Sequence, residues 1–464
     1  MSAPRCYHCA EFTRATLFRR SVAEAGRGLP AIEAGMPLPA GTGLDRRAFV
    51  SRAAGLALTV YGASALRPAA LDDGIARAAV SARGNRVLVS VFLPGGADAL
   101  SVLAPVGDAR YRRLRPNLAF KPGDGPVFRE DGRLHWHPSL APFAKLHKQG
   151  KLTVFPAIGY THPDQSHFTS RHYWEVGALD ARESVGWLGR YLDVVGDPDN
   201  AMQGLSLDGT LQPSLATGRV PVSTLASPAD YGFESHHVWD VVHELMEDAI
   251  ADLGALSRHP DPVLAQAAQT AAQSHSLHRQ LGRLVGKDGK VNYHTKVEYP
   301  DNEFGRRLAG LAAMLDAGFP IRAVALSGPG DYDTHADQAG PLADGLKTVA
   351  ETLAAFQRDL ERRGLAGRVL TLVWTEFGRR AEQNASNGTD HGAAGAAFLL
   401  GTKARGRMVG EFAGLNRLDK DGNLRATVDF RAVYSSLLEQ WFDVDAGRIV
   451  PDAKKMPRHS LVKA

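Results

Sequence analysis

Residues 369–392 constrain the fold of this chain more than any other stretch. They begin with six residues, Val369–Trp374, that are apolar or β-branched without alternation. This pattern is typical of a strand buried on both faces of a parallel sheet. The chain then turns polar at once, with Glu376 and Arg379 after the strand and Asp390-His391 shortly beyond. In open parallel sheets, ligands bind at the carboxyl ends of the strands, so the stretch predicts an active-site edge.

Three other apolar runs of this kind also end in polar groups. They cover residues 86–92, 152–157 and 321–326. The carboxyl ends of parallel strands meet at one edge of a sheet, so the groups that follow these runs are expected to lie close together. In chain order, these groups are Asp98; then His162, Ser166 and His167; then Asp331, Asp333 and His335.

Helical patterns separate the predicted strands. Residues 304–318 and about 341–363 carry apolar side chains at helical spacing, and further helices are expected over 139–150 and 427–441. Strands that alternate with helices indicate an α/β fold with a largely parallel sheet. We expect a single domain over residues 86–464.

The first 70 residues differ in charge from the rest. They carry nine arginines against four acidic residues, a net charge of +5, so the whole-chain charge of +4 leaves −1 for the remainder. The body therefore has no basic excess of the kind that nucleic-acid binding needs. The two cysteines, Cys6 and Cys9, also lie in this segment, without a second pair to complete a zinc site.

The same segment has the features of an export signal. Arg46-Arg47 followed by Ala48-Phe49-Val50 resembles the twin-arginine motif. The mildly apolar run 53–65 is shorter than the roughly 20 residues of a membrane-spanning helix, and it ends in a small-residue cleavage site. We predict that residues 1–70 are a leader with its translation start at Met36. The twin-arginine export machinery is then a partner, and the periplasm is the destination.

The chemistry of the strand-end groups indicates a metal site. They are carboxylates and imidazoles with one hydroxyl and no thiol, which suits zinc, manganese, magnesium or calcium. Acids that converge on one edge repel each other unless a cation balances them. We expect one or two divalent ions, which would hold an oxyanion and activate a nucleophile. The candidate ligands are Asp98, Asp333, His335, Glu376, Asp390 and His391.

Four segments resemble, in order, those of the DUF1501 family, a group of exported bacterial proteins related to the alkaline phosphatase/sulfatase superfamily. They are FLPGGADALSVLAPV, the segment from His137 through SHFTSRHYWEVG, YDTHADQ and TEFGRRAEQNASNGTDHGAA. The resemblance covers about residues 86–460. It implies an alkaline-phosphatase-like, three-layer α/β/α domain with a mostly parallel central sheet and a metal-binding edge.

The resemblance also implies roles for single residues. Asp98 is similar in position to a metal ligand of the first strand, and Ser166 to a nucleophile that also binds a metal. Asp333, His335 and His391 resemble the ligands of one metal. Glu376 lies where an Asp of an Asp-His pair is expected, but Phe377 follows it. The second metal therefore lacks an imidazole, and Asp390 is a candidate replacement.

Two functional interpretations follow. In the first, the protein is a periplasmic metal-dependent hydrolase of a phosphate or sulfate ester, on a small molecule or a polymer. Ser166 would then be the nucleophile, and Arg379 or Arg171 would bind the oxyanion. In the second, an exported binding or surface-assembly protein uses the same fold without turnover, which the missing imidazole favours.

Overall fold

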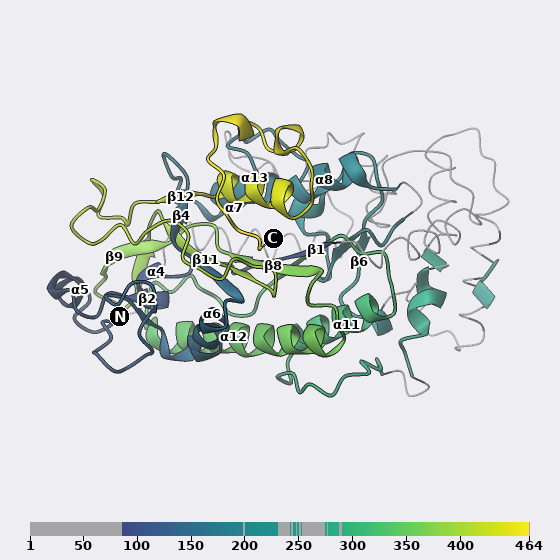
Figure 1. Ribbon diagram of the computed structural model, residues 1–464, viewed down its shortest axis with the longest axis horizontal. Helices are drawn as coiled ribbons and strands as arrows, with labels where there is room; N and C mark the ends of the chain where they lie inside the picture. The colour runs from purple at the N-terminus through teal and green to yellow at the C-terminus, as the bar shows by residue number, and fades with distance from the viewer. Residues whose placement is uncertain are drawn as a thin grey trace. The chain divides into compact units, whose positions relative to one another are not determined.

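The computed structural model describes residues 86–197, 200–230 and 290–463, together with part of the segment between 242 and 286 (Figure 1). The leader, including Cys6, Cys9, Met36 and Arg46-Arg47, lies outside the described residues, so its role stays a prediction. Contacts divide the described chain into a first unit, Leu88–Glu183 with Ser327–Ala464, and a second unit, Ser184–Leu326. The expected single domain over residues 86–464 likewise stays a prediction.

An eight-stranded sheet has the order β12-β4-β11-β8-β1-β7-β5-β6. The parallel pairs include β12 with β4 and β5 with both β6 and β7, whereas β11 is antiparallel to both of its neighbours. The expected α/β class with a mostly parallel sheet is confirmed. The strands are β1 (Val87–Phe92), β4 (Leu152–Gly159), β5 (Gly204–Ser206), β6 (Ser223–Thr224), β7 (Ala323–Ser327), β8 (Val369–Trp374), β11 (Gly395–Leu400) and β12 (Val428–Asp429).

Strands β1, β7 and β8 end at the same edge of the sheet. The Leu93 amide, just past β1, donates to the carbonyl of Trp374, the last residue of β8. The Gly328 amide, just past β7, donates to the carbonyl of Phe92, the last residue of β1. All residues of β1 and β8 are buried, which explains why neither strand alternates between polar and apolar residues.

Helices cover both faces of the sheet in the first unit (Figure 1). On one face, Trp174 of α7 (His167–Val176) stacks on Trp374 with ring centroids 5.2 Å apart, and on Phe430 of α13 (Phe430–Gln440) at 4.6 Å. On the other face, Phe143 of α6 (Ala141–Lys148) packs against Phe398 at 5.1 Å. The first unit is therefore a helix–sheet–helix sandwich.

The longest described helix, α12 (Ala339–Arg362), confirms the predicted amphipathic pattern. Its buried residues include Leu342, Leu346, Val349, Leu353, Phe356 and Leu360. This spacing of three and four residues places one apolar stripe along the helix. Smaller elements are α4 (Ala99–Val102), β2 (Leu103–Ala104), α5 (Ala109–Leu114), β3 (His135–Trp136), β9 (Arg379–Gln383) and β10 (Thr389–His391).

The second unit contains β5, β6 and most of β7 with helices α8 (Trp187–Val195) and α11 (Glu303–Asp316). Helix α11 begins one residue before the predicted start at 304, and the Asn302 side chain caps it by accepting from the Gly305 amide. None of the helices in the described part of the chain combines the length and the hydrophobicity of a membrane span.

Candidate metal centre

The loops after β1, β7 and β8 lie together, as the strand-end pattern predicted. The first loop turns at Gly95 and Gly96, with φ angles of 108° and 73° that favour glycine. A Cβ atom on Gly95 would lie 2.3 Å from the backbone nitrogen of Asp333, so glycine allows the close approach of the β1 and β7 loops. The amides of Gly95 and Gly96 donate to the Glu376 carboxylate at 2.9 and 3.2 Å. These contacts join all three loops.

Glu376 holds a histidine in place. His167 is buried at the start of α7, and its Nδ1 atom lies 2.7 Å from Oε1 of Glu376. The carboxylate also accepts from the Gly95 and Gly96 amides and the Thr375 hydroxyl. Burial opposes its charge, but His167 keeps the pKa of Glu376 below its ordinary value. Glu376 thus lies behind an imidazole, in the position of a residue that orients a ligand.

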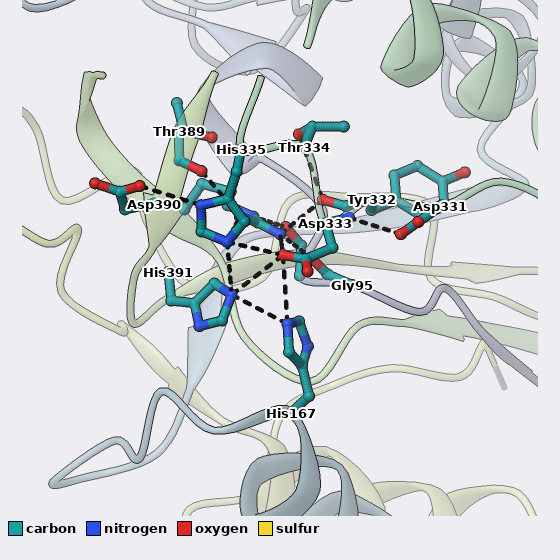
Figure 2. Close-up of polar contacts among 12 residues, drawn as sticks. Gly95, His167, Asp331, Tyr332, Asp333, Thr334, His335, Thr389, Asp390 and His391 are labelled. Atoms are coloured by element: carbon teal, nitrogen blue, oxygen red, sulfur yellow. Dashed lines mark hydrogen bonds and ion pairs between the residues drawn. The ribbon is translucent and has the colours of Figure 1, made fainter. Parts of the chain in front are cut away.

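Three histidines and one carboxylate converge on one point (Figure 2). The Nε2 atoms of His167, His335 and His391 lie 3.4, 3.1 and 3.1 Å from Oδ1 of Asp333. The Nε2 atom of His391 also lies 3.0 Å from Nε2 of each of the other two rings. We call these four residues the histidine cluster.

The Nδ1 atoms of the same three rings all face oxygen acceptors. The partners are Glu376 for His167, Asp390 at 3.1 Å for His335, and the Gln165 carbonyl at 2.8 Å for His391. A neutral ring that donates from Nδ1 presents a lone pair at Nε2. Three lone pairs therefore face one another and the Asp333 carboxylate. Only a cation, either a metal ion or a proton, relieves their repulsion.

Without a metal, the protonation of the cluster follows from the close approach of the three rings to Asp333. Burial disfavours a charged His167, but hydrogen bonds to Asp333 and Glu376 raise its pKa to about 9. Burial also disfavours ionised Asp333, but its hydrogen bonds to the three imidazoles and the Arg379 charge hold its pKa far below the ordinary value. Burial lowers the pKa of His391. Asp333 is therefore ionised, and His167 carries the extra proton.

The donor set fits a transition metal. The ligand atoms of His167, Asp333 and His391 all lie within 4.8 Å of one another, and His335 is adjacent as a fourth donor. Three protein ligands with a further position are typical of catalytic zinc sites. Imidazole-rich sets suit zinc, copper, iron or nickel, whereas magnesium and calcium prefer all-oxygen sites.

An apolar ring lies beside the cluster. Phe377 is buried, and its ring centroid is 4.8 Å from that of His167 and 4.9 Å from that of His391. This is the residue that stands where the family resemblance implies an imidazole for a second metal. The residues present therefore fit one ion better than two.

The cluster meets solvent on one side. The His167 side chain is 1% exposed and Asp333 is 11% exposed, whereas His335 is 22% and Asp390 51% exposed. Asn384 donates to both the His335 carbonyl and the Asp390 carboxylate on this side. Asp390, predicted as a ligand, contacts the cluster through His335 Nδ1, so it lies on the solvent side of that ring.

Asp98 has a different environment from the one predicted. Its carboxylate forms an ion pair with Arg115, and both side chains are fully buried. Asp98 also accepts from Ser101 Oγ at 2.6 Å and from Gln338 Nε2 at 2.7 Å. As the N-cap of α4, it accepts in addition from the Leu100 amide. The structure therefore places Asp98 in a buried ion pair and outside the histidine cluster, and its ligand role stays a prediction.

The proposed nucleophile and one of the proposed oxyanion-binding residues have structural contacts. Ser166 is the N-cap of α7, with its hydroxyl accepting from the Thr169 amide. Arg171 forms an ion pair with Glu175 at 2.7 Å, and its guanidinium lies 4.5 Å from the centre of the Phe92 ring. Their catalytic roles stay predictions.

Sequence reasoning placed His167 near the edge but gave it no ligand role, and it did not single out Arg115 or Gln338. Gln338 accepts from Thr334 Oγ1 at 3.0 Å and Thr389 Oγ1 at 2.5 Å, so it holds the two loops that carry Asp333 and His391. For His167, the available signal was its place directly after a strand-end loop. Arg115 and Gln338 carry no comparable signal.

Solved structures resemble this chain only distantly. A protein of the alkaline phosphatase superfamily from Vibrio parahaemolyticus is 10% identical, with a TM-score of 0.37 over 86% of this chain and 81% of that one. The PsFucS1 sulfatase from Pseudoalteromonas sp. is 10% identical, with a TM-score of 0.31 over 84% and 72%. The C-terminal periplasmic domain of EcEptC from Escherichia coli is 9% identical, with a TM-score of 0.33 over 81% and 89%.

No curated protein sequence matches the chain. The family model described as "Protein of unknown function (DUF1501)" matches residues 161–450, which include the whole histidine cluster. Because this match covers more than half of the sequence, the protein is a member of the DUF1501 family.

Proposed function

We propose that this protein is an exported hydrolase that uses one divalent transition-metal ion, with zinc the best fit, to cleave a phosphate or sulfate ester. The observation that carries the proposal is the convergence of three imidazole Nε2 atoms on Oδ1 of Asp333. Each ring is held in this orientation by an acceptor at Nδ1, which is the arrangement that metal-ligating histidines require.

The proposed role of each residue follows from its place in the histidine cluster. His167, Asp333 and His391 would hold the ion, and His335 would lie at its solvent side. A divalent ion at such a site supplies Lewis acidity and lowers the pKa of bound water. Glu376 and the Gln165 carbonyl orient the buried rings. The greater exposure of His335 and Asp390 marks the side from which a substrate would approach.

Charge balance supports a single ion. Of the carboxylates gathered at this edge, Asp98 is neutralised by Arg115 and Asp333 already has Arg379 at 2.6 Å. Glu376 faces His167, which is neutral when its Nε2 atom holds a metal, so Glu376 keeps its negative charge. One net negative charge therefore remains at this edge, and one divalent ion is enough to offset it.

A second candidate is an exported binding or assembly protein that holds the same ion without turnover. It is favoured by the contacts of the groups predicted to act in catalysis. The Ser166 hydroxyl caps a helix, and the Arg379 guanidinium donates to the Gly96, Thr389 and Tyr332 carbonyls and to Asp333, which occupies its donors.

One experiment separates the candidates. Protein purified without chelator is measured for metal content and for hydrolysis of p-nitrophenyl phosphate and p-nitrophenyl sulfate, beside His391→Ala. The matched control is His135→Ala, because His135 contacts the Gly125 carbonyl and not the cluster.

The hydrolase proposal expects about one metal per chain and ester turnover, both lost in His391→Ala and kept in the control. Metal without turnover on esters of either class would support the binding protein. A wild-type protein that binds no zinc, manganese, iron or cobalt would overturn both candidates.

A further inference from the structure

Arg379 is the first residue of β9, and its side chain has no exposed surface. Its guanidinium donates from Nε to the Gly96 carbonyl at 2.9 Å and from Nη1 to the Thr389 carbonyl at 2.9 Å. Its Nη2 atom donates to the carbonyls of Gly95 and Tyr332. A guanidinium that donates to this many protein groups has no spare donor arrangement for a substrate oxyanion.

These carbonyls come from three separate parts of the site. Gly95 and Gly96 form the loop after β1, Tyr332 precedes the ligand Asp333 after β7, and Thr389 lies two residues before the ligand His391. The fixed fork of a guanidinium spans several acceptors in one plane, which the single nitrogen of lysine does not. Arg379 therefore links the loop after β1 to the two segments that carry the ligands Asp333 and His391.

The same guanidinium also contacts a ligand directly. Its Nη2 atom lies 2.6 Å from Oδ1 of Asp333, the oxygen on which the three histidines converge. Nη1 lies 3.5 Å from Nε2 of His335. The Asp333 oxygen that faces the three rings (Figure 2) therefore also accepts from Arg379.

We propose that Arg379 is a positioning residue of the metal site, which sets the place of the Asp333 carboxylate by tying it to the loops after β1 and β7 and to the start of β10. The inference rests on the proposed metal site. It replaces the role of oxyanion clamp that the sequence suggested for Arg379.

Charge and positioning have opposite consequences here. A permanent positive charge beside a divalent ion repels it, so if Arg379 acted through charge alone, its removal would tighten metal binding. If it positions Asp333, removal weakens binding, because loss of an outer partner of a ligand typically costs about 10- to 100-fold in metal affinity. The two roles therefore predict changes of opposite sign.

The test measures Co²⁺ and Zn²⁺ affinity, the Co²⁺ absorption spectrum and thermal stability for wild type, Arg379→Met and Arg379→Lys. Arg431→Met is the matched control, because it also removes a nearly buried arginine that is paired with a carboxylate, Asp429. Asp333→Asn supplies the reference spectrum for a displaced carboxylate.

The proposal expects both Arg379 variants to bind Co²⁺ about 10- to 100-fold more weakly, with spectra shifted toward that of Asp333→Asn. Arg431→Met should keep the wild-type affinity and spectrum. A role confined to holding the fold would lower thermal stability while leaving the spectrum of bound Co²⁺ unchanged.

Three outcomes would overturn the inference while leaving the metal site intact. They are tighter binding by Arg379→Met, wild-type affinity and spectrum in Arg379→Lys, and failure of both variants to fold beside a folded control. In the last case the guanidinium would hold the fold as a whole. A wild-type protein without metal affinity would instead refute the proposed function.

Discussion

The Nδ1 atom of His167 lies 2.7 Å from Oε1 of Glu376, although the two residues are 209 positions apart in the sequence. Glu376 in turn is fixed by the amides of Gly95 and Gly96. The nitrogen of His167 that faces Asp333 is therefore oriented by a carboxylate on the opposite side of the ring. The loops after β1 and β8 therefore belong to the metal site, although neither loop carries a proposed metal ligand.

Replacement of Glu376 tests this relationship. Glu376→Gln keeps the size of the side chain, but an NH₂ group replaces one carboxylate oxygen. The side chain then cannot accept from the two glycine amides and the His167 imidazole at the same time. We expect zinc affinity to fall about 10- to 100-fold, measured by competition with a chromophoric chelator. Glu382→Gln, on an exposed position of β9, is the control. Equal affinities in the two variants would contradict the prediction.

Gly95→Ala tests the approach of the loops after β1 and β7. The added Cβ would lie 2.3 Å from Asp333 N. We expect about 1–2 kcal/mol of backbone strain and about 1–3 kcal/mol from the overlap, both measured by urea unfolding. Gly123→Ala is the control, since Gly123 has a similar φ of 97° with no atom within 4 Å of a Cβ. The two variants should differ by the overlap alone, and equal losses would refute the close approach.

Asp98→Asn distinguishes a structural aspartate from a metal ligand. It leaves Arg115 buried without its anion, which typically costs about 3–5 kcal/mol. We expect a large loss in the free energy of unfolding, with about one metal still bound per chain. Asp333→Asn should instead lose the metal, and because it also leaves the buried Arg379 without its anion, metal content and not stability separates the two variants. If Asp98→Asn lost the metal while its free energy of unfolding stayed unchanged, Asp98 would be a metal ligand after all.

Stability should depend on pH through His137. Burial lowers the pKa of this ring to about 4, although Asp98 opposes the shift, and its Nδ1 atom accepts from the Ser139 amide. The folded protein keeps the ring neutral while the unfolded chain binds a proton below about pH 6.5. The His137 contribution is therefore complete above pH 6.5 and is lost as the pH falls toward 4, by up to about 1.4 kcal/mol per pH unit.

Urea unfolding of wild type and His137→Gln between pH 7 and 4 measures this dependence. We expect the difference in free energy of unfolding between the two proteins to shrink as the pH falls. A difference that stays constant over the range would show that His137 does not titrate as its burial requires.

Export is tested at the leader. Replacing both Arg46 and Arg47 by lysine should keep the charge but block twin-arginine export, so that the protein accumulates in the cytoplasm of a bacterial host. Cell fractionation and immunoblotting measure the distribution. Arg52→Lys, which changes a leader arginine that lies downstream of Met36 and outside the arginine pair, is the control and should be exported normally. Unchanged periplasmic yield in the Arg46, Arg47 variant would remove the export proposal.

Much of the fold was predictable because it depends on local periodicity. Strands β1 and β8 have unalternating apolar runs because both of their faces are buried. Helix α12 has a single apolar stripe because only one of its faces is buried. The gathering of Asp333, His335 and His391 followed from the rule that parallel strands end at one edge. These features require only the pattern of neighbouring residues along the chain.

The sequence by itself therefore determined the α/β class, the strand-end position of the site and the nitrogen- and oxygen-rich chemistry of its groups. Only the tertiary structure decided which groups face one another. In the structure, Asp98 pairs with Arg115, Glu376 contacts the Nδ1 side of the His167 ring, and Arg379 donates to groups of separate loops. These outcomes depend on loop paths and side-chain rotamers. Asp98 and Arg115 are only 17 positions apart, whereas Glu376 contacts segments more than 200 positions away. No periodicity encodes such meetings, because each is set by the packing of the whole sheet edge.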